Sequence, residues 1–391
     1  MVTAAARPLP RATAHSPRAL AVRHLGPNWY ACVMGTAIVA TAGAALPLPV
    51  PGLRAACAGV WAFSVALLLT LLCARALHWR HHRDQARAHL LDPATAPFYG
   101  CLAMALLAVG GATLTVGRDW IGTEAAVAVD AVLFTAGTVV GLTAAVAVPY
   151  LMAVRHRLEV GQATPVWLLP VVAPMVSAAL GPLLVPHLPP GQPRETLLFA
   201  CCAMFGLSLL ATLAMLPMVF ARLVAGGPLP LALTPTLFLV LGPLGQSTTA
   251  AGNFADVAPG VVPAPYGEGF GVFAVLYGAP VMGFALLWFG LAAAHVLRAR
   301  RQGMGFAMTW WAFTFPVGTC VTGAETLARH TGLLAYDWLA VGLYGVLVVA
   351  WATAAVHTAR GLLSGSLLAA PRPAPAAPRP ATVRTTSGAA R

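Results

Sequence analysis

Residues 165–186 read PVWLLPVVAPMVSAALGPLLVP and contain no charged side chain. A helix needs about 20 mostly apolar residues to cross the hydrocarbon core of a bilayer, so this run predicts a membrane-spanning helix. It also carries Pro170, Pro174 and Pro182, and a proline inside a helix frees a backbone carbonyl that hydrocarbon cannot satisfy. Such a broken helix is stable only where it is buried in protein or lines an aqueous cavity. This stretch therefore predicts a membrane protein in which the broken helix is shielded from lipid by other helices or lines an aqueous cavity.

Nine further apolar runs of similar length occur along the chain. The ten predicted spans are 28–48, 54–76, 97–116, 125–154, 165–186, 196–221, 231–252, 270–297, 306–328 and 336–359. The fold class is therefore an all-α integral membrane protein, with one ten-helix transmembrane domain over residues 27–360. Residues 1–26 hold no apolar stretch long enough for a secretory signal, and residues 361–391 are rich in Pro, Ala and Arg. We expect a cytoplasmic N-terminal tail and a disordered cytoplasmic C-terminal tail.

Composition excludes the main alternatives. The 391 residues are 59% hydrophobic and 9% charged, with a mean hydropathy of +0.79, whereas soluble domains carry about 25% charged residues. The 38 glycines show no three-residue period, which excludes a collagen-like chain. All seven cysteines fall in apolar runs without a CxxC spacing, and we interpret them as packing residues. The sequence thus indicates no metal site and no cofactor.

The basic residues predict the orientation in the membrane. All 23 are arginines, and with ten spans and the N-terminus inside, nineteen fall on the inner side and four on the outer. The four outer ones are Arg54, Arg118, Arg194 and Arg329. This bias matches the retention of positive charge in the cytoplasm and places both termini there, in the cytoplasmic membrane. Because the arginines are spread over short loops, nucleic acid is not an expected partner.

Helix-breaking residues concentrate in the odd-numbered spans. In the fifth, seventh and ninth spans they are Pro165, Pro170, Pro174, Gly181, Pro182, Pro235, Gly242, Pro243, Gly245, Pro316, Gly318 and Gly323. This alternation predicts helical hairpins whose odd helix lies inside and whose even helix faces lipid. The alternative explanation is that proline is simply common in membrane helices.

Few ionisable residues lie within the spans, which limits the kind of solute. No arginine occupies the middle of a span, and the acids inside the spans are Asp130 and Glu325, for which a position at the membrane interface is the simpler explanation. A path without fixed cations suits anions held by hydroxyls, amides and the N-termini of broken helices. In residues 242–247, residues that break a helix lie directly beside polar side chains that could bind an anion. The candidate residues are Gly242, Pro243, Gly245, Gln246 and Ser247. The alternative explanation for this segment is close helix packing.

Residues 310–318, WWAFTFPVG, place aromatic rings beside a proline kink. A ring at such a point could plug a narrow pore, although most aromatic residues in membrane helices serve packing. No GxSG, HExxH or GxGD motif is present, and the histidines at 78, 81 and 82 match no standard zinc spacing. Catalysis is therefore not expected.

Three stretches resemble the tellurite-resistance/dicarboxylate transporter (TDT) family. Residues 29–39, WYACVMGTAIV, resemble the family's W(F/Y)xxVMGTGIV, with Ala37 in place of a glycine. Residues 242–247 resemble its GPxGQ element, and residues 310–316 resemble the WWAxTFP stretch of plant slow anion channels. The resemblance implies ten helices as five hairpins around a pseudo-fivefold pore, usually in a homotrimer, with the gating phenylalanine at Phe315. The motifs add Met34, Gly35, Thr36 and Thr314 to the candidate pore-lining residues.

The expected function is therefore transport of a small anion, with a C4-dicarboxylate such as malate or succinate first, and sulfite efflux or tellurite resistance as the alternative. A membrane receptor or scaffold is the candidate from another class. At 100 mV negative inside, a dianion gains about 4.6 kcal/mol by leaving the cell, so a passive pore would export. Uptake would need coupled protons, for which Asp130 and Glu325 are the candidates.

Overall fold

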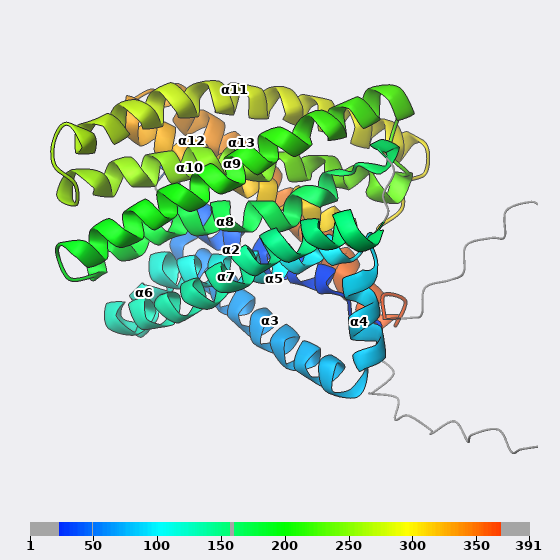
Figure 1. Cartoon of the computed structure of the whole chain (residues 1–391). Coiled ribbons are helices and arrows are strands. Elements are labelled where there is room, and N and C mark those ends of the chain that lie inside the picture. Colours follow the sequence, from blue (N-terminus) through cyan, green and yellow to red (C-terminus); the bar gives the residue numbers. More distant parts are fainter. Residues whose placement is uncertain (1–22, 49, 157–159, 369–391) are drawn as a thin grey trace, which may run out of the picture.

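The computed structural model describes residues 23–48, 50–156 and 160–368, and within them every regular element is a helix (Figure 1). The α-helices are α2 (Tyr30–Ala45), α3 (Leu53–His81), α4 (Arg83–Leu91), α5 (Tyr99–Ala112), α6 (Arg118–Ile121), α7 (Thr123–Leu151), α8 (Leu168–Leu180), α9 (Gln192–Gly226), α10 (Leu241–Val257), α11 (Tyr266–Arg301), α12 (Phe315–Thr331) and α13 (Leu334–Leu363). Shorter 3₁₀ and π-helical segments extend several of them.

In seven of the ten predicted spans, an unbroken run of helical residues is long and apolar enough to cross a membrane. The other three are the first, seventh and ninth, and each falls short for a physical reason. Helix α2 has only 16 residues, and the seventh and ninth spans, in which a 3₁₀ segment (Leu231–Val240 or Met308–Phe313) leads into the α-helix, are less apolar because α10 and α12 carry many polar side chains. The prolines and glycines of these segments favour such changes of helix type.

Burial separates the segments as predicted, with the odd-numbered ones inside. In Ala96–Ile121 and Pro165–His187, 89% of the most apolar 18-residue stretch is buried inside the protein. The corresponding share is 22–33% in the five long even-numbered helices. Most residues of α2, α10 and α12 are buried too. The long helices instead expose large apolar side chains, as expected for surfaces that face lipid.

The five buried helices contact one another in a closed ring. Helix α2 packs on α5, α5 on α8, α8 on α10, α10 on α12, and α12 on α2 again. Each also packs on the long helix that follows it, namely α3, α7, α9, α11 or α13. In Figure 1, α11 lies along the upper edge of the bundle and α3 along the lower edge, with α2, α5 and α8 between them. A short 3₁₀ segment precedes each ring helix, so the same break recurs five times.

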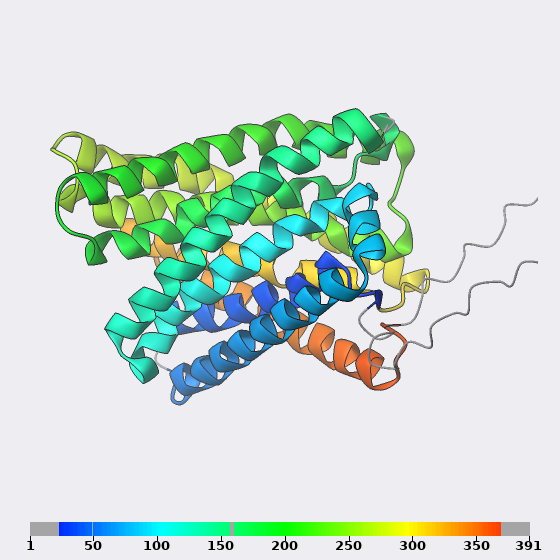
Figure 2. The ribbon, with the colours of Figure 1, turned by 60° about the horizontal axis from the view of Figure 1, so that its bottom comes forward.

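The two ends of the bundle differ. The described ends of the chain lie at the same end as α4, and Figure 2 shows the same arrangement from another side. The loop regions around α6 and between α10 and α11 lie at the opposite end, which we call the far end. Helix α13 extends to Leu363, and Leu367 and Leu368 pack on the core, so the predicted tail boundary at 361 is too early. The rest of both predicted tails, 1–22 and 369–391, lies outside the described residues.

Close backbone approach holds the ring together. A side chain added at Gly245 of α10 would lie 2.5 Å from the backbone nitrogen of Cys320 and the carbonyl carbon of Thr319 in α12. Backbone atoms cannot move aside as a flexible side chain can. The glycine is therefore required for the contact between α10 and α12.

Replacement of Gly245 should separate these two helices. We expect Gly245→Ala to lower stability by about 1–3 kcal/mol, the usual cost of overpacking, seen as a lower thermal unfolding midpoint of the purified protein in detergent. Gly290→Ala is the matched control, because nothing lies within 4 Å of that position on α11. Equal midpoints for the two variants would contradict the proposed contact.

Candidate functional site

The five ring helices converge on a very small apolar cavity. Its volume is about 10 Å³, and its walls include Met34 of α2, Met104 of α5, Leu168 and Val172 of α8, Gly242 of α10 and Phe315 of α12. A single water needs about 10–15 Å³. The centre of the ring is thus closed to any hydrated ion. Phe315 is only 2% exposed and sits at the first turn of α12, directly before Pro316.

Threonines lie between this cavity and the far end. Thr41, Thr249 and Thr322 each stand seven residues, or two helical turns, after a residue that lines the cavity: Met34, Gly242 and Phe315. Thr41 and Thr322 remain partly exposed although most of α2 and α12 is buried. The hydroxyl oxygens of Thr249 and Thr322 are 2.8 Å apart. One face of each of these helices therefore continues from an apolar constriction to a row of hydroxyls.

Most of these hydroxyl hydrogens are already committed to the backbone. The hydroxyl of Thr41 donates to the Ala37 carbonyl at 3.3 Å, and that of Thr322 to the Thr319 carbonyl at 3.1 Å. An anion would have to compete with these bonds. Side-chain amides are better placed to donate. Asn253 donates one N–H to the Ala179 carbonyl at 2.7 Å, and its amide carries a second N–H. The Oε1 of Gln246, which is an acceptor, has no partner within the described residues, so only the amide nitrogen of Gln246 could donate to an anion.

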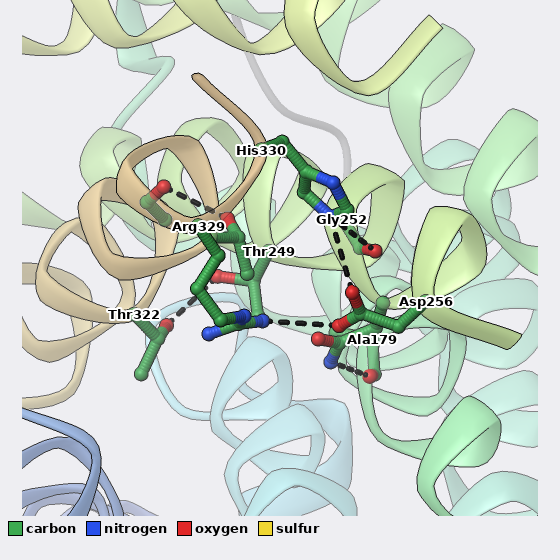
Figure 3. A network of polar contacts seen from close by, with 10 residues as sticks. Ala179, Thr249, Gly252, Asp256, Thr322, Arg329 and His330 are labelled. Atoms are coloured by element: carbon green, nitrogen blue, oxygen red, sulfur yellow. Dashed lines mark hydrogen bonds and ion pairs between the residues drawn. The ribbon is translucent and has the colours of Figure 1, made fainter. Parts of the chain in front are cut away.

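A charged cluster closes the row at the far end (Figure 3). Arg329 pairs with Asp256 at 3.1 Å, and the Nε2 of His330 lies 3.2 Å from the same carboxylate and 3.1 Å from the Gly252 carbonyl. Both neighbours of that nitrogen are acceptors, so Nε2 carries the hydrogen. The carboxylate is shared between a guanidinium and an imidazole.

Sequence reasoning treated Arg329 only as an outer loop charge and so missed this cluster. Arg329 is the only lysine or arginine in the five ring helices, and it stands two turns after Thr322. The seven-residue spacing of Phe315, Thr322 and Arg329 was the available signal. It places the ring's one permanent cation on the helix face that carries the constriction.

The two acids within the predicted spans are buried in protein. Asp130 is 1% exposed and Glu325 is 5% exposed. One carboxyl oxygen of each has no partner within the described residues. Glu325 belongs to ring helix α12, whereas Asp130 belongs to α7 and abuts Gly110 of α5. They lie on different helices and share no hydrogen bond.

Several other predicted pore residues face neighbouring helices. Gly35 packs against Thr314, whose hydroxyl donates to the Trp311 carbonyl at 2.7 Å. Thr36 accepts a hydrogen bond of 3.1 Å from Trp351 of α13. In α10, Pro243 is buried and Gly245 abuts α12. The hydroxyl of Ser247 donates to the Leu244 carbonyl of the same helix. The structure thus brings Met34, Gly242 and Phe315 together and places Gln246 one turn beyond.

Comparisons with known proteins agree with this architecture. A family model described as SLAC1, voltage-dependent anion channel, matches residues 24–359. An uncharacterized transporter of Methanocaldococcus jannaschii is 28% identical over 349 residues, covering 88% of this chain and 96% of the relative. The sulfite efflux pump SSU1 of Arthroderma otae is 26% identical over 342 residues, covering 85% and 89%. SSU1 of Trichophyton rubrum is 28% identical over 355 residues, with the same coverage.

The two kinds of carboxyl group should respond differently to neutralisation. We expect Glu325→Gln to leave the thermal midpoint unchanged or raise it, because the amide keeps the shape of the side chain without a negative charge, whose burial is costly. Asp256→Asn should lower the midpoint slightly, because an exposed ion pair contributes about 0–1 kcal/mol. A marked loss of stability in Glu325→Gln would show that the carboxylate has a stabilising partner.

Proposed function

This chain belongs to the SLAC1 voltage-dependent anion channel family, which includes the tellurite-resistance and dicarboxylate transporters, and on that premise we propose that small anions cross along the axis of its helix ring. In this proposal ten spans form five hairpins around a pseudo-fivefold pore. The closed order of contacts from α2 through α5, α8, α10 and α12 supports it, as does the 3₁₀ segment before each ring helix.

The convergence of all five ring helices on Phe315 is the observation that carries the proposal. The phenyl ring of Phe315 lines the central cavity and leaves only about 10 Å³ of it free. Such a constriction blocks ions by both size and dehydration, which is how a hydrophobic gate works. Beyond it, Gln246, Asn253 and the threonines offer partial charges without a fixed cation that would trap an anion. Movement of the ring would open a path with polar groups on one side.

Arg329 supplies the preference for negative solutes. A positive side chain at the mouth of a low-dielectric path raises the local concentration of anions and lowers that of cations. Asp256 and Glu325 temper this charge, so an entering anion is attracted without being held. The same cluster would disfavour metal cations.

The substrate that the relatives favour is sulfite, since two of them are named as sulfite efflux pumps. A C4-dicarboxylate such as malate or succinate is the second candidate, because of the resemblance to dicarboxylate transporters. For either dianion, the membrane potential drives export by about 4.6 kcal/mol at 100 mV. Carrier-type uptake would need protons, with Glu325 and Asp130 as candidate proton-binding groups.

The orientation and assembly follow from the arginine bias and from the family. We place the α4 end, and with it both termini, in the cytoplasm, and the Arg329 cluster on the outer face. A homotrimer with one pore in each subunit is the proposed assembly. A receptor or scaffold role is the rival, and its test is the absence of transport.

Flux measurements on purified protein in proteoliposomes test the function directly. The panel is sulfite, succinate, malate and chloride, each with and without a pH gradient. We expect sulfite to move fastest and the flux to follow the electrical potential. If none of the four anions crosses faster than in empty liposomes, the transport proposal fails and the scaffold remains.

Shortening the phenyl ring at the constriction should open it. We expect Phe315→Ala to raise anion flux tenfold or more, which corresponds to lowering the barrier to permeation by about 1.4 kcal/mol. Phe313→Ala is the matched control, since that ring packs on Phe238 at a centroid distance of 5.0 Å and does not line the cavity. Equal flux in Phe315→Ala and the wild type would remove the gate from Phe315.

Loss of the cation at the far-end mouth should reduce anion entry. We expect Arg329→Gln to lower anion flux severalfold at low ionic strength and less at high salt, because salt screens exposed charges. Arg118→Gln removes an exposed arginine of the same end outside the ring and should change little. A reduction that is independent of salt would argue for a structural rather than an electrostatic role.

A further inference from the structure

A buried arginine without a carboxylate partner lies at the α4 end of the bundle. Arg75 of α3 is 6% exposed, and its Nη1 donates to the Leu25 carbonyl at 2.7 Å. Its Nη2 lies 3.4 Å from the hydroxyl of Tyr99, whose ring centre is 6.0 Å from the guanidinium carbon. No Asp or Glu of the described residues forms an ion pair with it. Burying a charge is costly unless an opposite charge accompanies it.

The surroundings of Arg75 add positive charge rather than remove it. Arg80, Arg83 and Arg87 stand on the exposed surface of α3 and α4, close along the chain. Asp84, the one acid among them, pairs with Arg23 at 3.4 Å. Burial and the charge of Arg75 lower the pKa of His89 to about 4. His89 therefore stays neutral at pH 7.

A pocket opens beside Arg75 and has two kinds of wall. It measures about 210 Å³ and is lined by Arg75, Tyr30 and Tyr99 on the polar side and by Leu72, Ala76 and Leu102 on the apolar side. A groove of about 400 Å³, lined by Arg80, Arg83 and Arg87, adjoins it. Trp79 belongs to both. We call the two together the basic pocket.

We propose that the basic pocket binds an anionic membrane phospholipid, with its phosphate against Arg75 and its acyl chain along Leu72, Ala76 and Leu102. A guanidinium matches phosphate oxygens with two parallel hydrogen bonds. Arginine clusters beside a transmembrane helix are typical of sites for anionic headgroups. Free phosphate shares the ionic contacts but leaves the apolar wall uncovered, so the lipid is the better fit.

The position of the pocket connects this lipid to the ring. Arg75 bonds the carbonyl of Leu25, two residues before the 3₁₀ segment Pro27–Trp29 that leads into α2, and Tyr99 is the first residue of α5. A bound headgroup would neutralise Arg75 and hold the starts of two ring helices. Occupation of the pocket should therefore stabilise the folded protein.

Thermal unfolding of the purified full chain tests this proposal. In micelles containing phosphatidylcholine, we expect phosphatidylglycerol with the same acyl chains to raise the midpoint in a saturable manner, whereas inorganic phosphate at equal concentration does not. Arg75→Gln should weaken the apparent affinity for phosphatidylglycerol about tenfold. The combined variant Arg80→Gln, Arg83→Gln and Arg87→Gln should also weaken the apparent affinity for phosphatidylglycerol, by about fivefold for each arginine removed.

Arg298→Gln is the matched control. It removes one exposed arginine near the C-terminal end of α11, at the same end of the bundle but outside the pocket, and should leave the affinity unchanged. If Arg75→Gln does not fold, the combined variant decides, because its three side chains are exposed. Equal phosphatidylglycerol affinity in the wild type and the variants would overturn the proposal, and so would stabilisation by free phosphate alone. These readouts do not depend on anion flux, so failure of the transport proposal would remain distinguishable.

Discussion

The fold depends on satisfying backbone carbonyls that helix breaks release far from bulk water. Side chains of neighbouring helices reach interior carbonyls at several points of the bundle. Trp288 of α11 donates to the Leu237 carbonyl at 2.9 Å, and Asn253 donates to the Ala179 carbonyl. Thr319 reaches the Leu241 carbonyl at 3.3 Å. Hydrocarbon offers no such donors, so the broken helices must lie inside and the long helices must surround them.

The same requirement shapes the proposed path. Helix breaks bring polar groups and small residues to the interior, and the hydroxyls first serve the backbone of their own helices. The side chains that follow the constriction are therefore polar without a fixed cation, except at the far-end mouth. At the centre, five helices that must pack closely leave room only for the phenyl ring of Phe315. Closure and weak polarity thus follow from one packing arrangement.

The ends of the bundle show how charge is distributed around such an interior. At the far end, Arg329, Asp256 and His330 share hydrogen bonds and partly neutralise one another. At the α4 end, Arg75 is buried without a carboxylate partner, and exposed arginines surround it. An aqueous anion suits the first arrangement, because its charges are balanced and solvated. A membrane anion suits the second, because an apolar wall accompanies the unbalanced charge.

The sequence alone determined the membrane class, the approximate spans, the inner position of the odd helices, and the family. Each of these follows from the bilayer, whose thickness requires long apolar runs and whose lack of water confines helix breaks to the interior. Only the tertiary structure decided which way each ring helix is turned. Ring helices are buried on nearly all sides, so a contrast between a buried and an exposed face carries little signal of their rotation, and packing sets it instead. Packing turned Thr36, Gly245 and Thr314 toward neighbouring helices, buried Asp130 and Glu325, and aligned Arg329 with Phe315.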